Sequence, residues 1–243
     1  MPARRSEVDY ARMRAIAEEL MAHAPEDVWA TEISGDEIIM MMSPANLHEL
    51  IVYRLAKHVD RQLERSGTGL IAHGGADIED PESGIKRRPD VMIFPESALE
   101  SGEAVHPREV TAVVEVVSKS NPENDYEGKM RDYPIMGVPF YLIIDPRTGT
   151  GLVLSAPHQT PEGRRYSTRR EFTFGRPSGS VSTKSPPPIS QPTDRQRSLP
   201  GILGAHGTLR RCAAEPDPLA DAVARLALVR RCDSRGVRPL HRA

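Results

Sequence analysis

The sequence predicts a mixed α/β (α+β) fold, in which a mixed sheet is flanked by helices. The middle of the chain alternates β-prone apolar runs with amphipathic helical patterns, and its last patterned segments are again strands. Apolar periodicity then stops after Gly175. We therefore expect an N-terminal helix within residues 1–24, a folded domain over 25–176 and a tail over 177–243 that is disordered or aberrant.

The first part of the chain predicts a helix and a hairpin. Ser6 and Asp9 have capping-box-like spacing and open a helical pattern that ends near residue 23. Two β-prone runs, 28–33 and 37–42, flank a short turn that contains Gly35, which predicts a β-hairpin. The apolar positions of the first helix are Val8, Met13, Ile16, Ala17 and Leu20.

A long helix and a series of buried strands follow the hairpin. An apolar stripe closed by Gly67 predicts the long helix, and its members are Leu47, Leu50, Ile51, Leu55, Val59 and Leu63. A second helix is expected from Ser120 to about Met136, before Gly137. Polar loops are expected over 79–86 and 95–108. The predicted strands are 90–94, 110–117, 140–144, 151–155, 165–168 and 171–174.

Composition indicates a soluble, cytoplasmic protein. Two cysteines in 243 residues cannot build a disulfide scaffold, and the first residues mix basic and acidic side chains, unlike a secretory signal. The longest apolar runs, such as 38–42 and 140–144, are far shorter than the roughly 20 residues that cross a bilayer. No membrane association is expected.

The net charge of −2 hides two different compositions. Residues 1–176 carry 29 acidic and 21 basic side chains, whereas residues 177–243 carry 5 acidic and 11 basic ones. The basic tail has two interpretations: a flexible arm that holds nucleic acid through its phosphates, or an unstructured extension, for which a frameshift is one origin. We favour the second interpretation, because the composition changes abruptly in a strand-rich region.

Glu115 is an anomaly within the apolar run 112–117. Burying an unpaired carboxylate costs several kcal/mol, so Glu115 needs a cation, a metal or a proton. Asp90 begins the preceding strand and would face Glu115 if the two strands were neighbours. Two carboxylates, a backbone carbonyl and waters form a set of ligands that Mg²⁺ or Mn²⁺ accepts beside phosphate oxygens. Lys129 could then supply positive charge, and the combination is typical of phosphodiester hydrolysis.

Each of these residues also has a purely structural interpretation. Asp90 could bind a loop amide, and Glu115 could pair with Arg87 or Arg88. Lys129 lies four residues after Asp125, so the two could form a surface helix pair worth about 0.2–0.5 kcal/mol. Spacing alone does not choose between these interpretations and a metal site.

An ordered set of motifs resembles the Uma-two family of restriction endonucleases, which belongs to the PD-(D/E)XK nuclease-like superfamily. The likeness extends over about residues 25–175 and includes the Gly35 hairpin, Ser43-Pro44 and His48. The motifs that carry it are Arg88-Pro89-Asp90-Val91, Val114-Glu115-Val116-Val117-Ser118, Asp125-Tyr126-Glu127-Gly128-Lys129 with Tyr133, and Gly137-Val138-Pro139-Phe140-Tyr141-Leu142-Ile143-Ile144-Asp145-Pro146.

The resemblance implies a restriction-endonuclease-like core with a metal site at one edge of the central strands. It assigns Asp90 and Glu115 as Mg²⁺ (or Mn²⁺) ligands, and it moves the lysine role to Lys129, because Val117 occupies the usual lysine position. Additional candidates are Glu49 as an acidic ligand, His48 as a phosphate or water contact, and Tyr126 as a hydrogen-bonding residue. For His48 a cap or surface contact is the favoured interpretation, and for Tyr126 and Tyr133 it is packing.

The function expected from these features is metal-dependent hydrolysis of DNA phosphodiester bonds by an endonuclease. The alternative is a catalytically inactive nuclease-like module that binds nucleic acid or protein. Small nucleases that cut both strands often act as dimers, so a homodimer is one expectation. Zinc and nucleotide cofactors are not supported, because close Cys/His pairs and Gly-rich phosphate-binding motifs are lacking.

Overall fold

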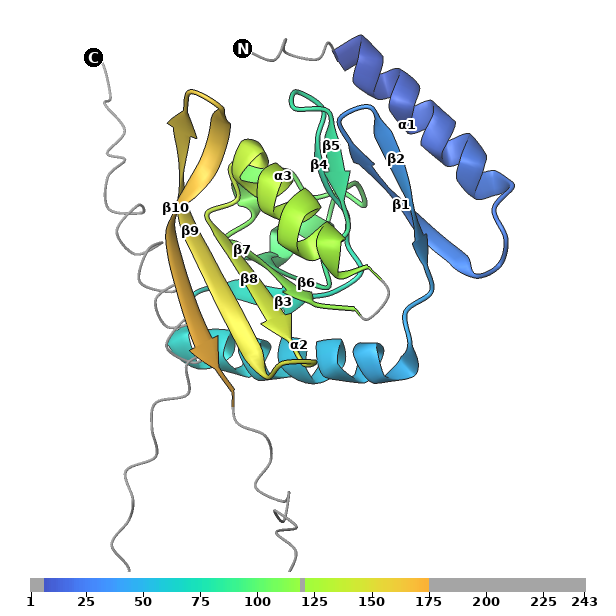
Figure 1. Cartoon of the computed structure of the whole chain (residues 1–243). Helices are drawn as coiled ribbons and strands as arrows, with labels where there is room; N and C mark the ends of the chain where they lie inside the picture. Colours follow the sequence, from blue (N-terminus) through green and yellow to red (C-terminus); the bar gives the residue numbers. More distant parts are fainter. Residues whose placement is uncertain (1–6, 119–120, 175–243) are drawn as a thin grey trace, which may run out of the picture. The chain divides into compact units, whose positions relative to one another are not determined.

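A computed structural model describes residues 7–118 and 121–174, all of which belong to one compact unit. Figure 1 shows two sheets, with a long helix along the bottom of the view and a shorter helix in front of the central strands. The mixed sheet flanked by helices that the sequence predicts is therefore confirmed. The tail over 177–243 lies outside the described residues.

The larger sheet has six strands in the order β10-β9-β8-β7-β6-β3. Strands β7 and β8 are parallel, and all other neighbours in this sheet are antiparallel. The parallel pair needs a crossover connection, which here contains one π-helical turn, η3 (Asn124–Gly128), and the helix α3 (Lys129–Met136). The strands are β3 (Leu70–His73), β6 (Val91–Pro95), β7 (Ala112–Val116), β8 (Phe140–Asp145), β9 (Thr150–Thr160) and β10 (Gly163–Thr173).

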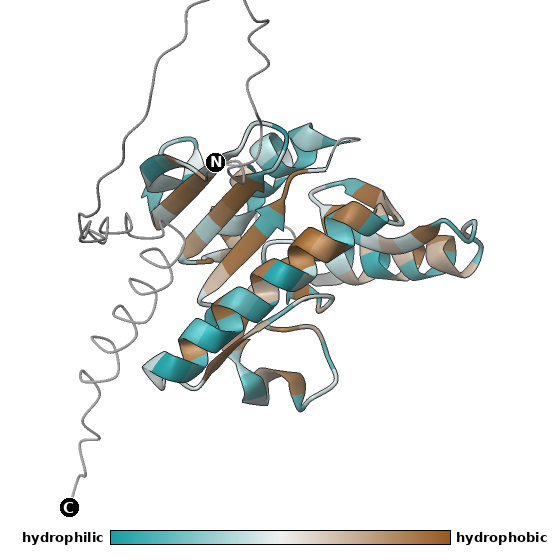
Figure 2. Cartoon of the chain, turned by 90° about the horizontal axis from the view of Figure 1, so that it is seen from below, coloured by the Kyte–Doolittle hydropathy of each residue, from teal (hydrophilic) through white to brown (hydrophobic). Residues whose placement is uncertain are grey.

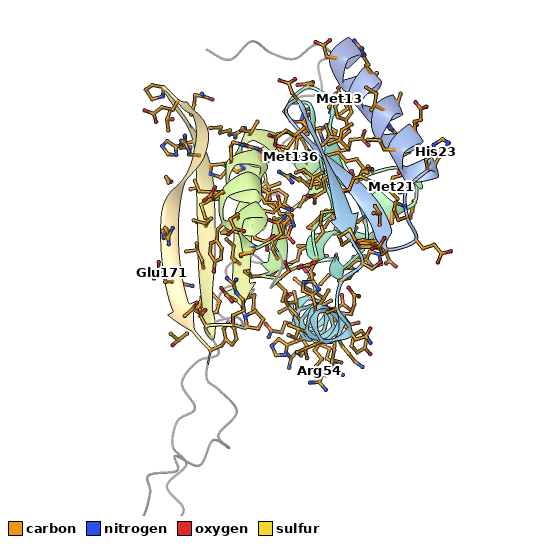
Figure 3. All side chains as sticks on the ribbon, turned by 45° about the vertical axis from the view of Figure 1, so that its right-hand side comes forward. Met13, Met21, His23, Arg54, Met136 and Glu171 are labelled. Atoms are coloured by element: carbon orange, nitrogen blue, oxygen red, sulfur yellow. The ribbon has the colours of Figure 1, made fainter. Side chains whose placement is uncertain are left out.

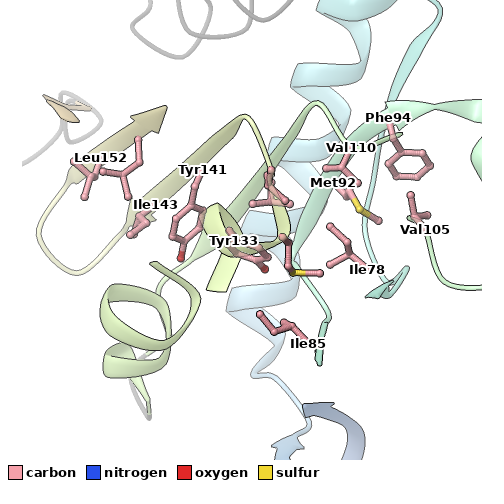
Figure 4. Close-up of a cluster of buried hydrophobic side chains, with 14 of the residues drawn as sticks. Ile78, Ile85, Met92, Phe94, Val105, Val110, Tyr133, Tyr141, Ile143 and Leu152 are labelled. Carbon is pink, nitrogen blue, oxygen red and sulfur yellow. The ribbon is translucent and has the colours of Figure 1, made fainter. Parts of the chain in front are cut away.

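The two faces of this sheet carry separate hydrophobic cores. Val113 and Tyr141 pack with Tyr133 of α3 on one face, where the Tyr133 and Tyr141 rings meet edge to face at 4.9 Å (Figure 4). Val114 packs with Val59 of α2 (Asn46–Ser66) on the other face. Because both faces are covered, β7 is buried at every position, which explains its apolar sequence.

The smaller sheet has four strands in the order β2-β1-β5-β4. Gly35, with φ of 63°, closes the hairpin between the first two strands in a left-handed conformation that glycine adopts without strain. The helix α1 (Glu7–Ala22) packs on this sheet through Tyr10 and Ala17, which meet Ile33. The strands are β1 (Val28–Ser34), β2 (Glu37–Met42), β4 (Ile78–Asp80) and β5 (Ile85–Arg87).

A buried arginine connects the smaller sheet to α3. Arg87 is fully buried, and its Nη1 contacts Oε2 of Glu32 on β1 at 2.7 Å. Its Nη2 contacts Oδ2 of Asp132 on α3 at 2.6 Å. Burial alone would lower the pKa of Arg87, but the two carboxylates raise it well above its usual value. The guanidinium therefore stays charged and links three elements that are far apart in the sequence.

The three predicted helices are present, the third as η3 followed by α3, but parts of the predicted apolar stripes of α1 and α2 are exposed. Ile16 and Leu20 of α1 are 38% and 42% exposed, and Leu47 and Leu50 of α2 are 64% and 41% exposed. The C-terminal half of α2 packs on the sheet through Leu55, Val59 and Leu63, while Arg54 points away from it (Figure 3). Figure 2 shows the resulting mixture of hydrophobic and hydrophilic residues along α2.

Three predictions of local structure were wrong. The segment 79–86, expected as a loop, contributes to β4 and β5, whose three residues each are too short to give a periodic signal. The segment 95–108 contains two short 3₁₀ helices, η1 (Glu96–Leu99) and η2 (Pro107–Glu109). The three strands expected after 150 are two long ones, β9 and β10, which form a continuous antiparallel hairpin.

In the part of the chain that the structure describes, no helix is both long and apolar enough to cross a membrane.

Two leucines of α2 provide a test of the core. Leu63→Ala is expected to lower the free energy of unfolding by about 2–5 kcal/mol, because Leu63 is buried and its removal leaves a cavity. Leu47→Ala, in the exposed first turn, should change it by less than about 0.5 kcal/mol. Urea unfolding of both variants measures the difference, and equal losses would contradict the described packing.

The Arg87 contacts provide a second test. Arg87→Met is expected to destabilise the protein by about 3–5 kcal/mol, because it removes the closest cation from two buried carboxylates, Glu32 and Asp132. The control is Arg14→Met, since Arg14 also contacts two carboxylates but its side chain is 55% exposed, and the expected loss is about 1 kcal/mol or less. Thermal unfolding compares the two, and a stable Arg87→Met protein would refute the link.

Candidate active site

Asp90 and Glu115 lie side by side at one end of the six-stranded sheet, where β6 begins and β7 ends. The strands are antiparallel, with Val91 opposite Val114, so the two carboxylates reach the same end of the sheet. The Asp90 amide donates to Glu115 Oε2 at 3.3 Å, and the Val116 amide donates to Asp90 Oδ2 at 2.7 Å. The structure thus brings the two predicted carboxylates together, and Asp90 also binds a backbone amide.

Lys129 is buried against Glu115. Its Nζ is 2.9 Å from Glu115 Oε2, 3.2 Å from Asp125 Oδ1 and 4.0 Å from Glu32 Oε1. The predicted pair with Asp125 therefore exists, but it is buried and not a surface pair. Burial alone would lower the pKa of Lys129, yet the surrounding carboxylates raise it well above its usual value.

Negative charge exceeds positive charge at this end of the sheet. One ammonium group faces three carboxylates, and Arg87 supplies a second cation to Glu32. Burial raises the pKa of Glu115 to about 8; Lys129 opposes this shift, and Asp90 and Asp125 add to it. A further cation at this place would favour the ionised form of Glu115.

His48 of α2 approaches the two carboxylates from the face of the six-stranded sheet that α2 covers. Its Nε2 is 2.8 Å from the Val116 carbonyl oxygen and 3.3 Å from Asp90 Oδ2. The hydrogen bond to Asp90 raises the pKa of His48 to about 9. The side chain is only 16% exposed, so the expected surface contact is wrong, and the imidazolium places positive charge beside Asp90.

The other two predicted candidates, Glu49 and Tyr126, lie at the edge of the site. The Glu49 side chain is 58% exposed and its carboxylate is 3.9 Å from His48 Nδ1. The Tyr126 hydroxyl donates to Asp145 Oδ2 at 3.2 Å and does not reach the carboxylate pair. Val117, at the usual lysine position, is buried in the core beside α3. Neither Glu49 nor Tyr126 contacts Asp90 or Glu115 in the described contacts.

Sequence reasoning did not assign three residues of this cluster to the site. Glu32 lies in β1, and its place in a largely buried strand was the only sign that it needs a charged partner. Asp125, four residues before Lys129, was predicted only as a surface partner of that lysine, and Tyr133, four residues after it, only as a packing residue. The Tyr133 hydroxyl donates to Glu115 Oε1 at 2.5 Å, which makes Tyr133 a partner of the carboxylate as well as a packing residue.

The cluster opens into a groove with a volume of about 1340 Å³. It is larger than most small-molecule pockets, which measure about 300–1,000 Å³. Asp90, Glu115 and Lys129 line it, as do apolar residues of β2 and α2. The groove therefore combines charged groups with an extended apolar wall.

The oxygen atoms at this site are of the chemical kind that Mg²⁺ and Mn²⁺ accept as ligands. The carboxylates of Asp90 and Glu115 and the Val116 carbonyl are hard oxygen donors, and the surplus negative charge favours a cation. The described residues contain no group of three His, Cys, Asp or Glu side chains arranged for a metal. A bound ion would therefore depend on two carboxylates, a backbone oxygen and waters.

Comparison with known proteins identifies the family of this chain. The model of the Uma2 (Uma-two) family, described as "Putative restriction endonuclease", matches residues 17–177. A solved structure titled as a "putative nuclease belonging to DUF820" from Anabaena variabilis ATCC 29413 is 16% identical, with a TM-score of 0.47; the match covers 64% of this chain and 83% of that chain. A search of curated proteins gave no match. Because the family model covers more than half of the sequence, this chain belongs to the Uma2 family.

Proposed function

We propose that this protein is a divalent-metal-dependent endonuclease that hydrolyses phosphodiester bonds of DNA. The observation that supports it most is the meeting of Asp90, Glu115 and Lys129 at one end of the groove. Membership of a family described as restriction endonucleases makes nucleic acid the expected substrate. The site chemistry and the family point to the same reaction class.

Each residue has a separate part in this proposal. Asp90 and Glu115 would hold Mg²⁺ or Mn²⁺, with Val116 contributing its carbonyl oxygen. When bound, the ion supplies Lewis-acid polarisation of the phosphodiester and a more acidic water. Lys129 keeps Glu115 oriented and favours its ionised form through the 2.9 Å contact. Tyr133 fixes the other Glu115 oxygen, so that Oε1 and Oε2 are both held.

His48 would contact the phosphate group of the substrate. Its Nε2 contacts Asp90 and the Val116 carbonyl, both of which are among the proposed donor atoms. A charged imidazolium at this point attracts a phosphate oxygen and neutralises part of its charge. We therefore propose that His48 helps to position the substrate, and that Glu49 and Tyr126 contribute less.

Nicking of supercoiled plasmid by the full chain tests the reaction. Asp90→Asn and Glu115→Gln are each expected to lower the Mg²⁺- or Mn²⁺-dependent rate by at least about 100-fold, the scale for losing a group that stabilises transition-state charge. These replacements keep the size of the side chain but exchange one acceptor oxygen for a donating NH2 group, so circular dichroism must show that the variants fold.

The control is Glu171→Gln on β10, whose carboxylate is exposed and contacts Arg169 (Figure 3). It should nick at the wild-type rate. Nicking that survives in both folded site variants would refute the roles of Asp90 and Glu115. A folded wild-type protein that neither binds the ions nor nicks would favour the inactive, binding module.

Thermal unfolding tests the metal site separately from catalysis. An ion that binds only the folded protein at a hundred times its dissociation constant adds about 2.7 kcal/mol to stability. Mn²⁺ should therefore raise the melting temperature of the wild type and of Glu171→Gln, and it should raise that of Asp90→Asn much less. An equal rise in all three proteins would place metal binding elsewhere.

A further inference from the structure

The apolar wall of the groove begins with an irregularity in β1. The pairing with β2 shifts between Val28, opposite Met42, and Ala30, opposite Met41, so Trp29 is the extra residue of a β-bulge. Bulges turn a side chain out of the regular alternation and are frequent beside active sites. Trp29 is 41% exposed and lines the groove. The bulge thus presents a large aromatic ring to the same space as the carboxylates.

A cation accompanies this ring. The Arg88 guanidinium carbon is 5.1 Å from the centre of the Trp29 ring, within the range of cation–aromatic attraction. Arg88 Nε also contacts Asp77 Oδ1 at 2.6 Å, which fixes the guanidinium in place. Arg88 lies two residues before Asp90 in the chain, so the ring and its cation are continuous with the candidate active site.

The wall continues along β2 and α2. Tyr53 of α2 is 58% exposed and lines the groove, and its hydroxyl accepts a hydrogen bond from Lys57 at 3.2 Å. Met40 and Met42 of β2 are 39% and 56% exposed and line the same groove. Aromatic rings and methionines offer flat or adaptable apolar contact, which suits the faces of nucleobases.

Charge along the groove is unsuited to the backbone of an intact duplex. Among the described residues that line it, the lysines and arginines are Arg88, Lys129 and Arg147, and each contacts a carboxylate. Duplex DNA hides the faces of its bases and presents mainly phosphates, which need many unpaired cations. An unpaired strand also offers the faces of its bases, and stacking on an aromatic side chain contributes about 1–3 kcal/mol per base.

We propose that the groove binds unpaired bases, stacked on Trp29 and Tyr53, so that the substrate is single-stranded or locally unwound nucleic acid. This inference rests on the proposed function, because it takes the phosphodiester next to those bases to be the one that reaches Asp90 and Glu115. The bases supply the binding contacts on the wall, and the polar end of the groove supplies the chemistry.

The single tryptophan makes the test direct, because all tryptophan fluorescence of the 243-residue chain comes from Trp29. The full chain, with divalent metal chelated by EDTA, is titrated with oligothymidylate and with the same oligonucleotide in a duplex. Single strands should quench the fluorescence saturably, and they should bind at least about tenfold more tightly than the duplex, as expected for one stacked base.

Anisotropy of a labelled oligothymidylate extends the test to variants. Trp29→Ala should weaken binding by about 5- to 150-fold, and Trp29→Phe should retain most of the affinity because it keeps a stacking ring. Leu20→Ala on α1 is the matched control, since Leu20 is 42% exposed and does not line the groove, and its affinity should not change.

Three results would overturn the inference. One is saturated binding of the single strand without quenching of Trp29, and another is duplex binding that is as tight as single-strand binding. The third is a Trp29→Ala protein with unchanged affinity but altered oligomeric state, because the wall would then join two copies of the chain.

Plasmid nicking separates this failure from failure of the proposed function. If nicking is lost in Asp90→Asn but oligonucleotide affinity is unchanged in Trp29→Ala, only the stacking inference is refuted. If Trp29→Ala weakens oligonucleotide binding but the wild type shows no metal-dependent nicking, the stacking inference is supported and the proposed nuclease function is refuted.

Discussion

The burial of one ammonium group among three carboxylates is the constraint on which the site depends. Lys129 must be charged to offset Glu115, Asp125 and Glu32, and those carboxylates in turn keep it charged. A buried arrangement of this kind stabilises only as a complete set, because removing one member leaves another unpaired. The fold therefore has to bring β1, β7 and the crossover helix together accurately.

The same elements explain why the site lies at a strand end. A central strand covered on both faces offers little room for polar groups, and Glu115 is tolerated because the helix that covers this face carries Lys129 and Tyr133. Asp90 is added by the antiparallel register of β6. The rigid sheet fixes the carboxylates, whereas the hairpin and α2 contribute the apolar wall of the groove, so chemistry and binding are carried by different elements.

The sequence revealed the parts of this arrangement that have local signals. Long periodic segments predicted α2, the hairpin and the central strands, and a lone glutamate in an apolar run identified Glu115. Neither the burial of only half of α2 nor the short strands β4 and β5 could be predicted, because both depend on contacts with distant residues. Glu32 was missed for the same reason: its cations, Arg87 and Lys129, lie 55 and 97 positions further along the chain.

The distances along the chain between contacting residues have a consequence for folding. Ser34 bonds Asp132 across 98 positions, and His48 meets Val116 across 68. Proteins dominated by such non-local contacts have a high contact order and fold slowly, since loop closure must precede any favourable contact. During synthesis the acidic cluster cannot be neutralised until the helix with Lys129 has emerged from the ribosome. Glu32 of the N-terminal hairpin therefore waits for two partners made later, first Arg87 and then Lys129, before it is paired as in the folded protein.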